Sequence, residues 1–345
     1  MSFTARVVVT IALVGLALLL WELRQVVLLL FGGIVFGTML GALAAVVSRQ
    51  AGMSYRWAVA VSLLLVVVVA GVIFWLIGGV MAAQLASMTD QVPQALDALR
   101  RWLQDQPLGS RLVEAWRAAS EHIPWTRVAS IGATAFNALG LFLLMLLMGV
   151  FLAADPGLYR RGFLRLLPPK ARATVDDAFT HAGSSLLGWL KGQAISMLFV
   201  GVATAAGLAL LEIPLAMTLG LLAGLLAFVP WVGPIAAGLL AILLAFTEGP
   251  QKALYVAVLM LAIEQTQDNV LMPFVQKWAV ALPPVLALIS FLIFAGLFGP
   301  AGMLFATPLM VVLMALVQRL YVQELLEPGS AGPSRSLPAD RPTGE

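Results

Sequence analysis

The sequence of 345 residues contains no cysteine and only two histidines, His122 and His181. Without cysteine the chain cannot form disulfides, thiolate metal sites or a cysteine nucleophile. Neither histidine belongs to a metal-binding or acid–base motif, and the sequence has no phosphate loop of the GxxxxGK(S/T) type. We therefore expect no cofactor, no bound metal ion and no ATP-driven step performed by this chain itself.

Charge is also scarce. Only 11% of the residues are charged and 61% are hydrophobic, whereas ordinary soluble domains have about 25% charged residues. The long apolar runs, such as 61–77 and 141–153, do not alternate in polarity as strands do. This composition predicts an all-α, polytopic membrane protein that contacts the lipid bilayer. The net charge of +3 is small and the basic residues lie in loops, which argues against a nucleic-acid partner.

Apolar segments predict about eight membrane helices plus a small extramembrane helical module. The N-terminal run after Arg6 lacks a signal-peptide cleavage site, so we expect it to stay as a membrane helix. We expect three N-terminal membrane helices (1–82), an extracytoplasmic helical module (83–130), a fourth membrane helix (131–153), a basic amphipathic cytoplasmic linker (154–191), a C-terminal transport core (192–321) and a disordered tail (322–345).

The linker 154–191 carries more basic than acidic residues, which places it in the cytoplasm by the positive-inside rule. Counting spans from there places the N-terminal end in the cytoplasm and the module 83–130 outside, and Arg319 at the exit of the last helix favours a cytoplasmic C-terminal end. The module has an apolar stripe at helical spacing, which we expect to face either its own second helix or, as we favour, a neighbouring subunit: Leu85, Met88, Val92, Leu96, Leu99 and Leu103.

Residues 264–273 place acids and amides between two apolar runs. On a helix, Glu264 and Asp268 share one face, and Gln265 and Asn269 form a second polar pair. Pro273 is expected to break the helix. An ionisable residue at the bilayer centre costs roughly 2.5–3.5 kcal/mol on insertion scales. Two interpretations stay open: an aqueous loop between helices, or a polar or coupling-ion site lined by a broken helix.

The C-terminal half also holds short apolar segments separated by proline and glycine. Segments 215–229 and 235–246 are shorter than the roughly 20 residues that a membrane span needs. The residues between them include Pro230, Gly233 and Pro234, which leave backbone groups unpaired. A re-entrant hairpin or two tilted helices at a cavity would satisfy this constraint. The alternative is that the prolines lie in ordinary loops between short membrane spans.

Six short motifs occur in a fixed order: Gly192-Gln193, Ile213-Pro214, Pro230-x-Val232-Gly233-Pro234, Asn269-x-x-x-Pro273, Leu282-Pro283-Pro284, and Phe298-Gly299-x-x-Gly302 followed by Thr307-Pro308. Together they resemble the autoinducer-2 exporter family of permeases. The resemblance implies a bacterial inner-membrane protein of about eight helices that forms a homo-oligomer, with a pentamer as one candidate state. Some members are assigned export of autoinducer-2, and others are similar to sodium/proton antiporters. The chain has Leu282 where a histidine is frequent in the family, so a proton role for that histidine does not carry over.

Our leading functional hypothesis is secondary, ATP-independent export of a small polar solute such as autoinducer-2, coupled to protons or sodium. Glu264 would bind and release the monovalent cation, and Asp268 would share that role. Gln193, Gln265 and Asn269 would offer neutral hydrogen bonds to the solute. Pro230, Gly233, Pro234 and Pro273 would serve as hinges.

Three alternatives remain: a sodium/proton antiporter of the same family, a passive oligomeric channel, and a scaffold that recruits partners through the module 83–130. We do not expect an enzyme, because the sequence shows no convincing Ser–His pair, facing Asp pair or HExxH motif.

Overall fold

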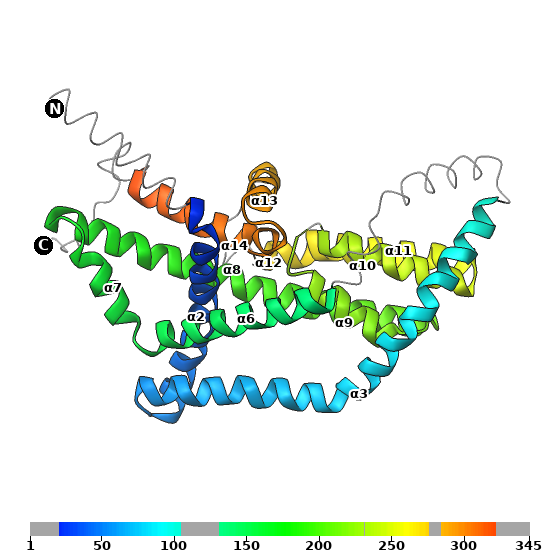
Figure 1. The fold of residues 1–345 in the computed structure, drawn as a ribbon, viewed down its shortest axis with the longest axis horizontal. Coiled ribbons are helices and arrows are strands. Elements are labelled where there is room, and N and C mark those ends of the chain that lie inside the picture. The colour runs from blue at the N-terminus through cyan, green and yellow to red at the C-terminus, as the bar shows by residue number, and fades with distance from the viewer. Residues whose placement is uncertain (1–20, 105–130, 231, 276–283, 322–345) are drawn as a thin grey trace, which may run out of the picture.

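The computed structural model describes residues 21–104, 131–230, 232–275 and 284–321, which form helices joined by short turns (Figure 1). The predicted first membrane helix, much of the module 83–130, the Leu282 position and the tail 322–345 lie outside the described residues. The all-α prediction is confirmed for the described part. Its α-helices are α2 (Arg24–Ala51), α3 (Tyr55–Gln104), α6 (Ile131–Ala154), α7 (Pro156–Arg165), α8 (Pro169–Leu210), α9 (Ala216–Leu226), α10 (Val232–Ala245), α11 (Pro250–Thr266), α12 (Met272–Val275), α13 (Pro284–Phe298) and α14 (Pro300–Val317).

Three helical segments are long and apolar enough to cross a membrane: Arg24–Ala51, Pro169–Leu210 and Pro300–Tyr321. A fourth span results if Gly140–Ala154 and Pro156–Arg165, which meet at 85°, count together. Shorter apolar helices, including α9 and α10, lie where the sequence predicted segments too short to span alone. The described residues therefore support a multi-pass membrane protein.

Helices α2 and α6 pack closely because glycines face each other. A Cβ atom placed on Gly149 of α6 would lie 2.7 Å from the Cβ of Phe36 and 3.0 Å from the carbonyl oxygen of Gly33. A Cβ on Gly33 would in turn lie 2.8 Å from the Cβ of Met148. In lipid, where apolar burial gives little drive, small residues let helix backbones approach and gain van der Waals contact.

Helix α3 runs without a break through residue 82, where the sequence suggested that membrane helix gives way to module. It contains Pro93, a residue that kinks helices, and Figure 1 shows α3 turning away from its first direction. The part after the turn packs on the same chain. Val92 and buried Ala95 join the core around Leu244, and Trp102 contacts Phe246 with ring centroids 5.6 Å apart.

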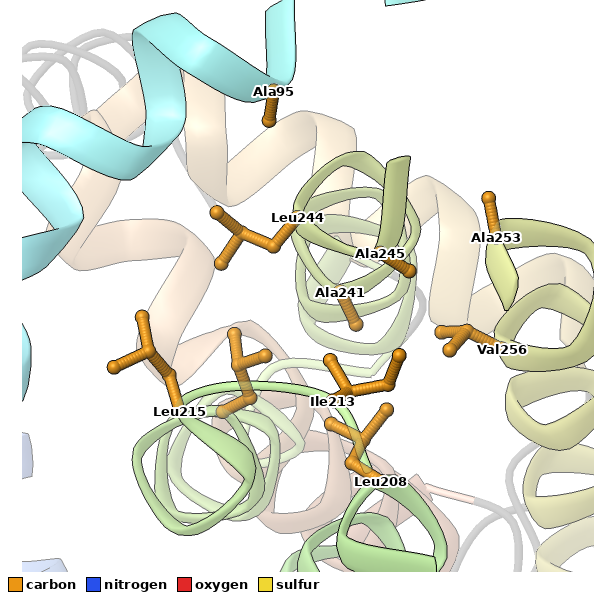
Figure 2. Packing of buried hydrophobic residues seen from close by; sticks show 10 residues of the cluster. Ala95, Leu208, Ile213, Leu215, Ala241, Leu244, Ala245, Ala253 and Val256 are labelled. Carbon is orange, nitrogen blue, oxygen red and sulfur yellow. The ribbon is translucent and has the colours of Figure 1, made fainter. Parts of the chain in front are cut away.

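Val92 of the predicted apolar stripe packs against the short helices of its own chain. Figure 2 shows the cluster, in which Leu208, Ile213 and Leu215 meet Leu244 and Val256. Helix α3 thus covers part of the surface of α9 and α10, and a contact of the stripe with a neighbouring subunit stays a prediction.

Helix α8 begins at Pro169, since proline fits the first turn of a helix. It continues without interruption from the polar linker into the apolar span and ends at Leu210. The second half of the linker and the apolar span thus share one helix.

Gly149→Ala should lower the free energy of unfolding by about 1–3 kcal/mol, because the added methyl group overpacks the α2–α6 contact. Gly140→Ala on the same helix is the matched control, since a Cβ there meets nothing within 4 Å. Denaturant unfolding in detergent micelles measures both. Equal stability of the two variants would contradict the close contact.

Candidate functional site

The polar stretch 264–273 is helical and not an irregular loop. Helix α11 ends at Thr266, a π-helical segment η2 follows at Gln267–Leu271, and α12 begins at Met272. We had expected Pro273 to break the helix, but the helix continues through it. A proline ring collides with the carbonyl four residues earlier, and the wider π-turn relieves that collision. Segments of this kind occur frequently at functional sites.

The four candidate side chains of this stretch lie on an exposed surface, except that Glu264 is half-buried. The predicted amide pair is present, because Asn269 Nδ2 donates to the backbone oxygen of Gln265 at 2.9 Å and to its Oε1 at 3.0 Å. Asp268 follows Glu264 by four residues and is exposed. The stretch therefore presents carboxylates and amides together.

The exposed face of α11 changes character along its length. It is apolar at Leu254, Val258 and Leu261, and it becomes polar at Gln265 and Asp268. An apolar exposed face suits lipid, whereas carboxylates in lipid are costly. The polar end therefore needs contact with water, with a solute or with other protein.

Gln193 contacts the neighbouring break in the helices. Its Nε2 donates to the carbonyl oxygen of Ala227 at 2.6 Å, just after α9 ends. Ala227 is buried, so this amide satisfies a carbonyl that the end of α9 leaves without a helical partner. The structure thus gives Gln193 a positioning contact in addition to the solute-binding role that the sequence suggested.

Helix α8 connects this break with the π-helical segment. Gly207 lies against Leu259 of α11, while Val200 and Ile263 share one core cluster, so the two helices run antiparallel. Gln267 follows Ile263 by four residues and therefore comes level with the middle of α8, near Gln193. Contacts between α8 and both η2 and α12 agree with this register.

The turn between α9 and α10 depends on glycine. A Cβ on Gly233 would lie 1.8 Å from the carbonyl oxygen of Leu226, which no L side chain tolerates. The Gly233 amide donates to the carbonyl of Val229 at 3.0 Å, and Pro234 follows in the first turn of α10. The predicted hinge at Pro230, Gly233 and Pro234 is thus a closely packed turn.

Sequence reasoning missed two buried polar groups. The Oε1 atom of Gln267 and the hydroxyl of Thr204 on α8 have no hydrogen-bond partner among the described residues. Both could have been found from their spacing, because Thr204 follows buried Val200 by four residues and Gln267 follows buried Ile263 by four. Such groups in apolar surroundings are costly and therefore point to a polar environment nearby.

A cavity of about 290 Å³ lies elsewhere, between α2 and the junction of α6 with α7. None of the five candidate residues lines it. Within the described ranges, no group of three or more His, Asp or Glu side chains is placed to hold a metal ion.

Comparison with known proteins gives a consistent result. The sequence profile described as AI-2E family transporter matches residues 9–321. The putative transport protein YueF of Bacillus subtilis is 31% identical over 44% of this chain and 41% of its own length. The putative transport protein MT0215 of Mycobacterium tuberculosis is 27% identical over 73% of this chain and 72% of its own. The AI-2 transport protein TqsA of Escherichia coli is 26% identical over 76% of this chain and 79% of its own. This chain therefore spans less than half of the length of YueF.

Gly233→Ala should destabilise the protein by about 1–3 kcal/mol or more, because the methyl group must displace backbone atoms of α9. Gly238→Ala in the same helix is the control, since the nearest atom to a Cβ there is 3.9 Å away. Thermal unfolding in detergent measures the difference. Equal melting temperatures of the two variants would contradict the close packing of this turn.

Gln193→Leu should cost about 1–3 kcal/mol of stability, because it leaves the buried Ala227 carbonyl without its donor. Gln251→Leu, which removes an exposed amide, should change stability by less than about 0.5 kcal/mol. Solute affinity is measured alongside unfolding. A variant with unchanged stability but weaker solute binding would show that Gln193 acts as a ligand and not as a positioning residue.

Proposed function

The chain belongs to the AI-2E family of transporters, and from this premise we propose that it is a secondary transporter that exports a small polar solute without ATP. Family membership makes it a membrane transporter and not an enzyme. The observation that carries the proposal is the π-helical interruption of an apolar helix at a pair of carboxylates. Broken helices lining an ion or solute site are a recurring feature of secondary transporters.

Glu264 is the proposed coupling residue. It is half-buried while its neighbours on the polar face are exposed, so it sits between the protein interior and the proposed path. A carboxylate there can take up a proton or sodium ion on one side of the membrane and release it on the other. Asp268, four residues on, offers a second carboxylate to the same cation.

The amides would bind the solute. Gln265 and Asn269 already form one hydrogen-bonded pair, which holds both side chains in a fixed orientation with donors and acceptors left over. The solute proposed is autoinducer-2 or a molecule of similar polarity, because the relative TqsA is named an AI-2 transport protein. Gln193 would support this site through the α9 terminus as well as by direct contact.

Conformational change would centre on the two interruptions of the helices. The Pro230–Pro234 turn and the Pro273 region both adjoin α8, so a shift at one can reach the other through that helix. Residues that absorb backbone rotation at the ends of elements are the usual hinges in gating motions.

We further propose the setting of this site. The protein would cross the bacterial inner membrane about eight times, with both chain ends and residues 154–191 in the cytoplasm, and would assemble as a homo-oligomer such as a pentamer. The short helices α9 and α10 would form a re-entrant or tilted pair. Oligomerisation would cover part of the exposed polar face of α11.

Sodium/proton antiport is the second candidate. The pair of carboxylates favours it, because two acids four residues apart can exchange one cation for another without any organic solute. The passive-channel and scaffold alternatives have no comparable observation among the described residues, and they are outcomes of the experiment below.

Glu264→Gln and Asp268→Asn should each reduce transport driven by a proton or sodium gradient in proteoliposomes, because each removes a titratable cation ligand. Glu248→Gln is the control, since Glu248 lies apart from the site and pairs with Lys252 at 3.7 Å. Autoinducer-2 flux and a trapped pH dye are recorded together. If the unmodified protein moves protons but no autoinducer-2, and the two variants lose this proton flux, antiport is favoured.

Full gradient-driven flux in both variants would contradict the coupling assignment. Flux that ignores the gradient in the unmodified protein would instead support a passive channel. No flux of either kind, combined with loss of function on deleting 83–130, would support a scaffold.

A further inference from the structure

Helix α7 turns sharply away from α6, the predicted fourth membrane helix. The axes of Gly140–Ala154 and Pro156–Arg165 meet at 85°. Asp155 fixes this corner, because its carboxylate accepts from the Leu158 amide at 3.0 Å and pairs with Arg56 at 3.3 Å. If α6 crosses the bilayer, α7 therefore lies close to the plane of the membrane surface.

One face of α7 is held by the protein. Arg160 forms an ion pair with Asp176 and donates to the hydroxyl of Thr180 at 2.6 Å, both on α8. The rings of Phe163 and Phe179 lie 5.2 Å apart. Helix α7 is thus docked on the polar first half of α8 and cannot swing freely.

A second face of α7 is apolar and uncovered. The side chains of Leu158 and Leu166 are 57% and 82% exposed, and Tyr159 is also exposed. At about 100° per residue, these three positions lie on the same side of α7 and of the turn that follows it. Exposed leucines in water forgo about 25 cal/mol for each Å² of apolar surface that could be buried, so a partner for this face is favoured.

Cations border the apolar face. Arg161 and Arg165 lie on the adjoining arc and are exposed, and Lys170 follows at the start of α8. Arg172 donates to the Leu167 carbonyl at 3.1 Å, which helps to hold the chain between α7 and α8. Apolar residues next to arginines on a helix parallel to the bilayer suit the headgroup layer of an anionic membrane.

We propose that α7 is an interfacial helix that binds anionic phospholipids, with Leu158, Tyr159 and Leu166 at the acyl boundary and Arg161 and Arg165 at the phosphates. The occupant is the bilayer surface itself, because α7 continues directly from α6, the predicted fourth membrane helix, and its charge is complementary to anionic headgroups. This inference concerns a surface outside the transport site and does not depend on what is transported.

The contact would reach the rest of the molecule through α8. Arg319, at the end of the α14 segment, forms an ion pair with Asp177, one residue from the Asp176 that holds α7. Lipid binding at α7 would therefore fix the polar end of the helix along which both interruptions lie.

The absence of cysteine allows single-site labelling to test the position of α7. Spin labels are placed at Leu158→Cys and Leu166→Cys, with Ala173→Cys on the exposed polar half of α8 as reference, in nanodiscs of phosphatidylcholine with added phosphatidylglycerol. We expect labels 158 and 166 to collide more with oxygen than with a water-soluble nickel complex, and label 173 to show the reverse. A label at 158 as open to the nickel complex as label 173 would overturn the proposal.

Lipid charge is tested with Arg161→Gln/Arg165→Gln in the Leu158→Cys background. The double variant should need a higher phosphatidylglycerol fraction to bury the label, because each basic residue at an anionic surface contributes about 1 kcal/mol, or about fivefold in affinity. Arg100→Gln/Arg101→Gln on α3 removes the same charge elsewhere and should leave the titration unchanged. Identical titrations for the two double variants would overturn lipid recognition by α7.

Discussion

A polar group inside a membrane needs a partner, and this requirement explains the C-terminal half of the molecule. Lipid offers no hydrogen bonds, so each interruption of a helix must be satisfied by the protein, by water or by a solute. At the end of α9 the partner is a side chain, since Gln193 donates to the Ala227 carbonyl. At the end of α11 the chain keeps its hydrogen bonds by widening into a π-helical turn. Among the described residues no hydrogen bond or ion pair holds the carboxylates there, and we propose that they serve in transport.

Helix α8 gives these interruptions a common support. Its apolar half contacts α9 and α11, and its neighbour α14 packs along it. Close approach is possible because small residues face each other, as at Gly201, where a Cβ would lie 3.3 Å from the Gly220 carbonyl oxygen. The polar half of α8 extends to α7 and Asp177. One continuous helix thus joins the proposed lipid-binding surface, the α9–α10 turn and the π-helical segment.

The sequence predicted regular elements well because composition and proline decide them locally. The apolar run at 131–153 became α6. Predictions failed where packing between distant segments determines the local structure or its contacts. Pro273 indicated a break, but the helix continues through a π-turn whose formation depends on its neighbours. The contact of Val92 with the short helices could not be foreseen, because both surfaces are merely apolar in sequence. The polar pair Gln265 and Asn269 was predicted from spacing alone, whereas the partner of Gln193 lies 34 positions away.

In the proposed mechanism the acids and amides of the π-helical segment meet water at membrane depth. A fluorophore on Asn269→Cys, in the otherwise cysteine-free chain, tests this directly when quenched in turn by aqueous iodide and by lipids carrying a nitroxide at the headgroup or in the middle of the acyl chain. Leu198→Cys, exposed on the apolar part of α8, serves as the lipid-facing reference. We expect quenching at position 269 by both iodide and the mid-chain nitroxide, and at position 198 by the nitroxide alone. Strongest quenching of position 269 by the headgroup nitroxide would place the segment at the membrane surface and contradict a site at membrane depth.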